Sequence, residues 1–263
     1  MSIIQGTAKG GSASFYDYPI GDSLRFDGSS YLSRTPTTAG NQKTWTWSSW
    51  VKRTSTSTGA EVLFQVGIGS DYIWFLYSAN NLYTQQNPNS IIQLRTTQVF
   101  RDVGAWGHIV LAVDTNQSSG SDRVKLYFNG AQITSFAIDT YPSPNLDTYV
   151  NATNTHIIGT NGGLTTNYVG YLANIQFIDG QALDQYFFGE FKDNIWVPYN
   201  AFSTAGSGTA TASDGDTATD SYGTNGFHLT FEDGIESLPV GGYTGNQNAF
   251  RDKSHNTNHW KIN

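Results

Sequence analysis

The carboxylates closest to a metal-binding spacing are Asp214, Asp216 and Asp220, in the stretch SDGDTATD. A calcium loop of this type needs alternating oxygen ligands and a glutamate that closes the loop at its twelfth position. Asn225 stands at that position instead. Because residues 203–221 also lack large apolar side chains, we interpret this stretch as a solvated loop or spacer.

Histidine is the second residue type that could bind a metal or move a proton. His255 and His259 are four residues apart, but residues 256–258 between them form helices poorly, which argues against a shared helical metal site. His108 is expected on a strand, opposite Ile109, as a hydrogen-bonded or half-buried residue. No set of serine, aspartate and histidine is recognisable from chain order, so no nucleophile is assigned.

Aromatic side chains with hydrogen-bond donors beside them offer a third kind of chemistry, the stacking and hydrogen bonding of sugar rings. Tyr72, Trp74, Tyr83 and Arg95 lie in a region where such a face is expected. Exposed aromatic residues serve protein interfaces as readily as ligands, and the same residues suit a core. We therefore predict a glycan or partner contact at these four positions, with core or subunit packing as the alternative.

The elements that must position these residues are short strands. From about residue 24 to 180, β-branched and aromatic residues alternate with turn residues at the spacing of a β-sandwich. Arg123 to Phe128 alternates apolar and polar side chains, and Asn129-Gly130 follows directly, which predicts a type I′ hairpin with a return strand in 131–136. Tyr72 to Tyr77 is apolar on both faces, as in a strand covered on both sides.

The chain divides into three parts by composition. We expect an N-terminal docking arm (1–22), a jelly-roll sandwich (23–195) and a C-terminal extension rich in Gly, Ser, Thr and Asn (196–263), with one further strand at Gly226 to Phe231. Apolar residues at helical spacing predict one short helix at Leu183 to Phe191.

Composition excludes several classes of function. The net charge of −7 repels phosphate backbones and anionic lipid, so nucleic acid is not an expected partner. The absence of cysteine excludes a disulfide framework and thiolate metal sites. The N-terminal stretch lacks the features of a secretory signal, and no apolar run reaches the roughly 18 residues of a membrane span, so we expect synthesis in a cytoplasm and no membrane insertion.

Four segments in order carry a family resemblance: GHIVLAVDT (107–115), VKLYFNGAQI (124–133), HIIGTNG (156–162) and YVGYLANIQFIDGQAL (168–183). Together with SLRFDGSSYLSRT (23–35) and TWTWSSWVKR (44–53), they resemble the laminin-G-like, concanavalin-type lectin superfamily over about residues 23–190. The resemblance implies an all-β, antiparallel jelly-roll sandwich of two packed sheets.

Relatives with this fold include glucanases that use two glutamates on one strand. The four glutamates here, Glu61, Glu190, Glu232 and Glu236, do not form that motif, so the chain is expected not to be an enzyme. Many relatives bind calcium through loop oxygens. The resemblance makes calcium a conceivable ligand, with Asp71, Asp114, Asp139 and Asn161 as weak candidates, although Asp114 and Asp139 equally suit the turns at strand ends.

The flanks narrow the resemblance to laminin-G-like proteins of marine bacteriophages, through FYDYPIGDSLRF, SRTPTTAGNQKTWTWSSWVKR, FGEF, WVP, YGTNGFHLTFEDG and DKSHNTNHW. This implies a virion structural protein, a tail fibre, spike or capsid decoration subunit on the particle surface, made in the host cytoplasm. Its expected partners are other virion proteins, copies of itself in a homo-oligomer such as a trimer, and host-surface glycans. The alternatives are a free lectin and a polysaccharide depolymerase.

Overall fold

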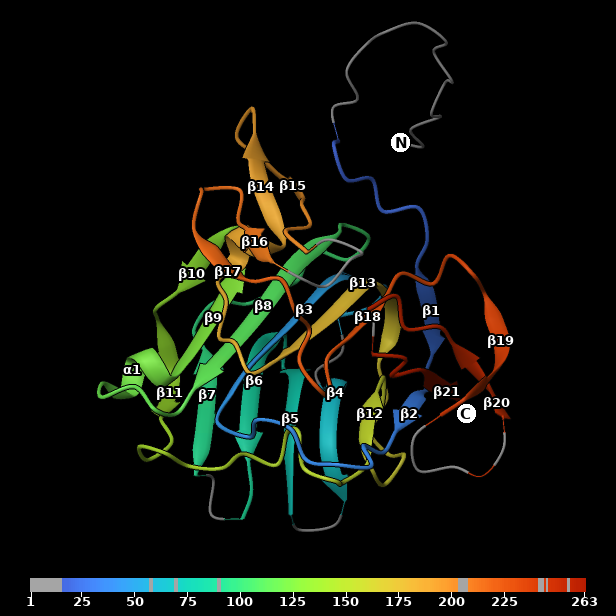
Figure 1. Ribbon diagram of the computed structural model, residues 1–263. Helices are drawn as coiled ribbons and strands as arrows, with labels where there is room; N and C mark the ends of the chain where they lie inside the picture. The colour runs from blue at the N-terminus through green and yellow to red at the C-terminus, as the bar shows by residue number, and fades with distance from the viewer. Residues whose placement is uncertain are drawn as a thin grey trace, which may run out of the picture.

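The computed structural model describes residues 16–56, 59–68, 71–88, 91–202, 208–240, 244, 246–254 and 256–263, and the side chains of Ile68, Asp71 and Trp74 lie outside that description. Two antiparallel sheets pack face to face, as Figure 1 shows. The expected all-β antiparallel sandwich is confirmed. No helix within the described ranges is long and apolar enough to cross a membrane.

The smaller sheet has seven strands. Its main path runs in the order β1 (Leu24–Asp27), β13 (Val169–Asp179), β3 (Thr44–Arg53), β8 (Gly107–Asp114), β9 (Val124–Phe128) and β10 (Ala131–Ile133), and β18 (Phe227–Leu229) also pairs with β13. A single helical turn, α1 (Gly120–Arg123), precedes β9. The long central strands β3 and β13 organise this sheet.

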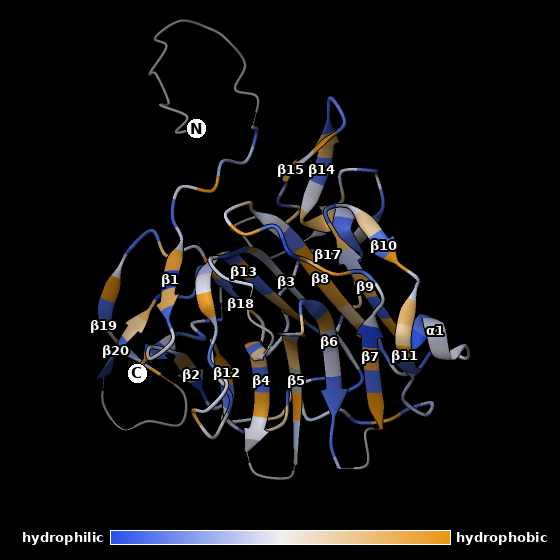
Figure 2. Cartoon of the chain, turned by 180° about the vertical axis from the view of Figure 1, so that it is seen from behind, coloured by the Kyte–Doolittle hydropathy of each residue, from blue (hydrophilic) through white to orange (hydrophobic). Residues whose placement is uncertain are grey.

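The larger sheet has ten strands. They are, in order, β11 (Phe136–Thr140), β7 (Ile92–Thr96), β6 (Asn81–Gln86), β5 (Asp71–Ser78), β4 (Ala60–Ile68), β12 (His156–Ile158), β2 (Leu32–Arg34), β21 (Trp260–Ile262), β20 (Asn246–Phe250) and β19 (Ile235–Pro239). Figure 2 shows this sheet from behind, with hydrophilic residues along β6 and β7.

The main core lies between the two sheets and is rich in aromatic side chains. Trp45 and Trp47 point into it from β3, and Trp260 enters from β21 near the chain end. Trp47 meets Phe75 edge to face, with ring centroids 5.4 Å apart. Such geometry adds about 0.5–1.5 kcal/mol to the stabilisation from burial alone.

The predicted hairpin is confirmed. Strands β9 and β10 pair antiparallel across Asn129 and Gly130, whose φ angles are 46° and 79°. A type I′ turn requires positive φ at both central residues, and Asn-Gly tolerates this best. The turn is followed by β10 and then, after two residues, by β11 in the other sheet.

A second apolar layer covers the outer face of the smaller sheet. Val110, Tyr127 and Ile178 from that sheet pack against Phe187, Phe202 and other residues of the segment that follows β13. This segment holds a 3₁₀ turn, η1 (Gln185–Phe187), and two hairpins, β14 (Gly189–Lys192) with β15 (Ile195–Pro198) and β16 (Thr209–Thr211) with β17 (Thr217–Thr219). The β14–β15 hairpin projects from the top of the molecule in Figure 1.

The helix predicted at Leu183 to Phe191 is wrong beyond one turn. Helical structure is limited to η1, and the chain then extends into β14, where it pairs with β15. Gly189 explains the change, because a Cβ at that position would lie 2.2 Å from the ring of Trp196. Packing of that indole onto an extended backbone therefore outweighs the helical periodicity.

The strand predicted at Gly226 to Phe231 is confirmed as β18, but the prediction that it is the one further strand after residue 196 is wrong. Strand β18 joins the smaller sheet, strands β19, β20 and β21 extend the larger one, and the stretch interpreted as a spacer contains the β16–β17 hairpin. Ala210 and Ala212 of this stretch are buried against the outer face of the smaller sheet. Small side chains and a polar strand such as β20 give no alternating apolar pattern, so the sequence conceals these elements.

Candidate functional site

The outer face of the larger sheet carries the residues predicted to contact glycans. Tyr83 pairs with Arg95 across β6 and β7, and with Leu76 of β5 on its other side. Since alternate residues of a strand share a face, the register places positions 72, 74, 83 and 95 on one face. The side chain of Trp74 lies outside the described residues.

Amide groups hold both tyrosine rings on this face. Asn87 donates a hydrogen bond to the Tyr72 hydroxyl, and Gln93 donates one to the Tyr83 hydroxyl. Arg95 is half-buried and donates to Asn81 Oδ1 over 3.1 Å. These bonds anchor the hydroxyl ends of both tyrosine side chains before any ligand arrives, which reduces the entropy lost on binding.

Polar and apolar groups alternate across the same face. Gln85 pairs with Gln93 next to the Tyr83–Arg95 pair, and all four side chains are half-buried. We call the set Tyr72, Tyr83, Gln85, Gln93 and Arg95 the tyrosine face. Aromatic rings flanked by amide and guanidinium groups can stack on a sugar ring and bind its hydroxyls.

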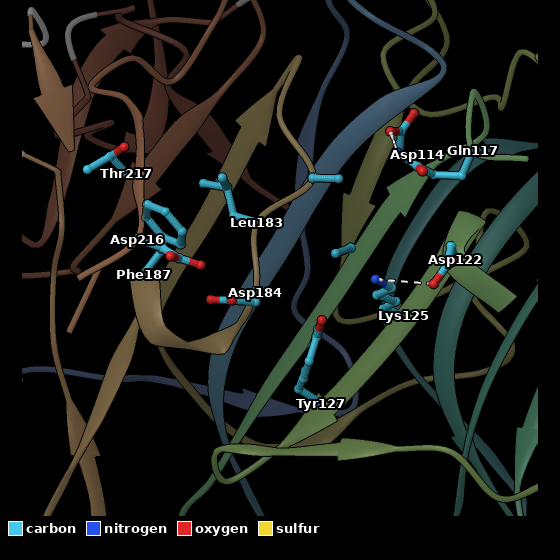
Figure 3. A pocket seen from close by; sticks show the side chains of 12 residues that line it. Asp114, Gln117, Asp122, Lys125, Tyr127, Leu183, Asp184, Phe187, Asp216 and Thr217 are labelled. Atoms are coloured by element: carbon cyan, nitrogen blue, oxygen red, sulfur yellow. Dashed lines mark hydrogen bonds and ion pairs between the residues drawn. The ribbon is translucent and has the colours of Figure 1, made fainter. Parts of the chain in front are cut away.

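A polar cavity of about 600 Å³ lies on the other side of the molecule, over the outer face of the smaller sheet. Figure 3 shows Tyr127 from β9 and Asp114 and Gln117 near the end of β8, facing Asp184 and Asp216 from the covering segment. At the wall of the cavity, Lys125 forms an ion pair with Asp122 at 3.4 Å.

Three carboxylates meet beside this cavity. Asp184, Asp214 and Asp216 each offer an oxygen, and these oxygens all lie within 4.8 Å of one another. Burial raises the pKa of the Asp184 carboxyl, and the negative charges of Asp214 and Asp216 raise that pKa further. Carboxylate oxygens are the ligands that hard cations prefer, but acidic groups on a surface occur commonly without one.

Sequence reasoning missed this acidic group. Asp214 and Asp216 lie in the turn of the β16–β17 hairpin, where Asp214 accepts a hydrogen bond from the Asp216 amide at 3.2 Å. Asp184 comes from a distant part of the chain and precedes η1, where it accepts a bond from the Tyr186 amide at 2.9 Å. No spacing in the sequence signals their meeting, because the hairpin that unites them has no apolar alternation.

The four weak calcium candidates lie on different elements. Asp114 accepts bonds from Asn116 and Gln117 in the turn after β8, as the turn interpretation predicts. Asp139 is exposed on β11, Asn161 accepts a bond from the Thr165 amide in a loop, and the side chain of Asp71 lies outside the described residues. None of them belongs to the group of three carboxylates.

The four glutamates are dispersed, and no two share a strand. Glu61 on β4 forms a buried ion pair with Arg53, Glu190 on β14 lies 3.3 Å from Lys192, and Glu236 on β19 pairs with Arg251. Glu232 stands in the turn before β19. The four glutamates therefore do not form the pair on one strand that glucanases use.

His108 on β8 is hydrogen-bonded, as one of the two predicted alternatives has it, and it is fully buried and does not activate a nucleophile. Trp196 Nε1 donates to His108 Nδ1 over 3.1 Å, so the ring proton lies on Nε2, which donates to Ser48 Oγ over 2.9 Å. Burial lowers the pKa of His108 to about 3. A neutral imidazole with this tautomer cannot accept the serine proton. His255, of the rejected histidine pair, lies outside the described residues, and His259 accepts from the Asp252 amide at 3.0 Å.

Two antiparallel sheets with a covered outer face define a lectin-type β-sandwich. The family model for the concanavalin A-like lectin/glucanases superfamily matches residues 26–185, and the chain belongs to that superfamily. No curated protein matches the sequence.

Among solved structures, the chain is similar to a putative carbohydrate-binding protein from Bacteroides ovatus. The two share 12% identity at a TM-score of 0.53, and the match covers 92% of this chain but 57% of that one. Weaker likenesses link it to a heptameric SAP-like pentraxin from Limulus polyphemus, with 19% identity, TM-score 0.47 and coverage of 62% and 77%. Domain 4 of the extracellular arabinanase AbnA from Geobacillus stearothermophilus, solved with arabinotriose, gives 20% identity, TM-score 0.48 and coverage of 68% and 80%.

Proposed function

We propose that the chain is a non-enzymatic, lectin-like module that binds glycans through the tyrosine face. The observation that carries this proposal is the alignment of Tyr72 and Tyr83, each held by an amide, beside Arg95 on one face of the sheet. A flat aromatic face suits an extended saccharide, whose rings present apolar C–H faces. The sandwich fold shared with a putative carbohydrate-binding protein supports the same class of ligand.

Binding to a glycan array, with calcium present, tests this proposal. We expect the wild type to bind at least one glycan, and Tyr83→Ala to weaken that binding about tenfold, because the lost stacking contributes about 0.5–1.5 kcal/mol. Tyr83→Phe keeps the ring and should retain most of the affinity. Arg95→Ala removes the guanidinium of the tyrosine face and should also weaken binding, and Arg101→Ala, at an exposed arginine outside that face, is its matched control. A blank array would overturn the proposal.

We infer further that the module is displayed on the surface of a bacteriophage particle, as a fibre, spike or decoration subunit in a homo-oligomer. The flanks that carry the resemblance to phage proteins support this role. The C-terminal flank is an integral part of the sandwich, because Phe227–Leu229 of YGTNGFHLTFEDG form β18 and Trp260 of DKSHNTNHW lies in the main core. The module and its C-terminal flank therefore fold as one unit.

Mass spectrometry of gradient-purified virions tests the particle role. Detection of the protein is the expected result, and particle imaging would then place it on the head or the tail. Light scattering on the purified chain tests the oligomer, for which a closed trimer is the expected state. Absence of the protein from purified virions would overturn the virion role and leave a free lectin.

A polysaccharide depolymerase is the alternative from another class of function. The missing glutamate pair argues against it, although the three carboxylates beside the polar cavity have spacings near the roughly 5 Å of retaining glycosidases. Incubation with host capsule or with laminarin-like glucans should yield no product. Product formation that Asp184→Asn abolishes would identify an enzyme instead.

A further inference from the structure

A second cavity, of about 440 Å³, lies beside the N-terminal arm, and four aromatic residues contribute to its lining. Its walls come from four places: the outer face of the smaller sheet, Tyr16 and residues 19–23 of the arm, the loop before β8 with Trp106, and strand β15 of the projecting hairpin. We call it the aromatic pocket and define it by Tyr16, Asp22, Trp50, Trp106 and Trp196. Its volume falls in the range of small-molecule sites.

The floor of the aromatic pocket is rigid. Trp50 and Trp196 both stack on the imidazole of His108, at centroid distances of 5.0 Å and 6.0 Å. Trp50 also pairs in register with His108 on β8 and with Ala173 on β13, so it stands at the centre of the sheet. Because stacking on His108 holds both indoles, and a hydrogen bond to His108 also holds Trp196, a ligand would meet a surface that is already organised.

The rim of the aromatic pocket is open to solvent. Trp106 is 39% exposed and Tyr16 is 41% exposed, although both are large and mostly apolar. Trp106 is held edge-on against Tyr171, with centroids 6.5 Å apart. Large aromatic side chains exposed around a concavity mark binding sites more often than isolated surface positions do.

The floor also holds a hydrogen-bond donor with no acceptor. Trp50 is 8% exposed, and its Nε1 is buried without a hydrogen-bond partner among the described residues. Trp196 differs, because its Nε1 is bonded to His108. Because Nε1 of Trp50 has almost no accessible surface, a ligand in the cavity would contact the ring of Trp50 rather than this donor.

We propose that the aromatic pocket is a separate binding site for one neutral sugar ring. A sugar ring combines an apolar C–H face, which can stack on the indoles, with hydroxyls that can donate to Asp22. Asp22 is the single charged residue among the described lining residues, so the site disfavours acidic sugars. A proline-rich peptide would suit the rings, but proline has no N–H to offer Asp22.

This inference shares its class of ligand with the proposed function but depends on different residues, and the test separates the two. The full chain is titrated with glucose, galactose, mannose and N-acetylglucosamine while the indole N–H resonances are followed by NMR, with assignments from Trp→Phe variants. We expect one of these sugars to shift the Trp50 and Trp106 resonances, because both indoles line the cavity and the sugar ring would stack on them. Trp106→Ala should weaken the binding of that sugar about tenfold.

Two variants control for indirect effects. Trp106→Phe keeps a ring at the rim and should retain most of the affinity, and Val103→Ala, an exposed change in the same loop, should have no effect. Tyr83→Ala should leave the Trp50 shift unchanged. If no sugar moves Trp50 or Trp106 while glycans still bind through Tyr83, this inference is overturned and the proposed function stands.

The reverse result is equally informative. Loss of all sugar binding in Trp106→Ala, with full binding in Tyr83→Ala, would confirm the aromatic pocket and overturn the tyrosine face as the glycan site. Shifts produced by a proline-rich peptide, and by none of the sugars, would overturn the sugar assignment and identify a peptide-binding groove instead.

Discussion

The indole of Trp196 donates its N–H to Nδ1 of His108 over 3.1 Å, and this bond fastens the β14–β15 hairpin to the centre of the smaller sheet. The bond also fixes the tautomer of a histidine that has no access to solvent. On the other side of the ring, Ser48 Oγ accepts a hydrogen bond from His108 Nε2. A single hydrogen-bonded row thus connects the covering layer to the sheet.

Replacing Trp196 by phenylalanine should destabilise the protein by about 1–3 kcal/mol, because His108 Nδ1 would remain buried without a donor. Urea denaturation of the variant and the wild type measures the difference. Trp106→Phe is the matched control, since Trp106 is exposed at the rim of the aromatic pocket. Equal losses in both variants would show that ring size, rather than the bond to His108, determines stability.

The buried histidines predict a loss of stability in mild acid. Burial lowers the pKa values of His108, His156 and His228 to about 3, whereas an unfolded histidine titrates near 6.5. Between these values the unfolded chain binds more protons, so stability is complete above pH of about 6.5 and falls as the pH drops toward about 3. The slope reaches about 1.4 kcal/mol per pH unit for each histidine.

Urea denaturation across this pH range measures the effect. His228→Gln, although less stable, should show a shallower dependence on pH, because one of the three groups no longer titrates. A free energy of unfolding that stays constant between about pH 6.5 and 5 would contradict the burial of neutral histidines.

The ion pair of Arg53 and Glu61 predicts a large mutational effect. Arg53 Nη2 lies 2.5 Å from Glu61 Oε2, and both side chains are almost fully buried. Glu61→Ala should cost about 3–5 kcal/mol, because the guanidinium would stay buried without its counter-charge. Glu236→Ala breaks the exposed pair with Arg251 and should cost no more than about 1 kcal/mol. Urea denaturation measures the loss in free energy of unfolding for each variant. Similar losses for the two variants would contradict the prediction that the buried pair matters more than the exposed one.

The acidic group predicts a coupled titration. Burial raises the pKa of the Asp184 carboxyl first, and the charges of Asp214 and Asp216 add to the increase. Asp216→Asn removes one negative charge, so the pKa of Asp184 should fall, which NMR titration of the side-chain carboxyl carbon measures. Because the raised pKa makes ionised Asp184 unfavourable in the folded state, the variant should gain stability above about pH 4 and not below it. An unchanged pKa would show that the charges do not interact.

The fold could be predicted from sequence where an alternating apolar pattern is followed by residues that favour a hairpin turn. The β9–β10 hairpin combines alternating Val124, Leu126 and Phe128 with Asn129-Gly130, so local preference and sheet pairing agree. In the segment that covers the outer face of the smaller sheet, local preference and packing disagree. Leu183 and Phe187 follow helical spacing, yet the contact between Gly189 and Trp196 selects an extended chain, and that contact is visible only in three dimensions.

The candidate sites also divide into residues that could be brought together from the sequence and residues that could not. Tyr72, Tyr83 and Arg95 could be placed near one another because they lie on successive strands of a meander. Asp184 and Asp216 could not, since their proximity depends on the β16–β17 hairpin. The aromatic pocket was equally hidden, because its floor combines Trp50 of β3 with Trp196 of β15, two residues whose sequence contexts are unrelated.

Strand β2 is bordered by β12 on one side and by β21 on the other, and Asn263 donates to Ser33 across 230 residues of sequence. During synthesis, the second edge of β2 therefore stays uncovered until the distant strand β21 has been made. Pairings between such distant residues slow folding and leave strand edges open to other chains. The nascent polypeptide is thus prone to aggregate while β2 lacks β21, and shielding of β2 by a chaperone would improve the yield of folded protein.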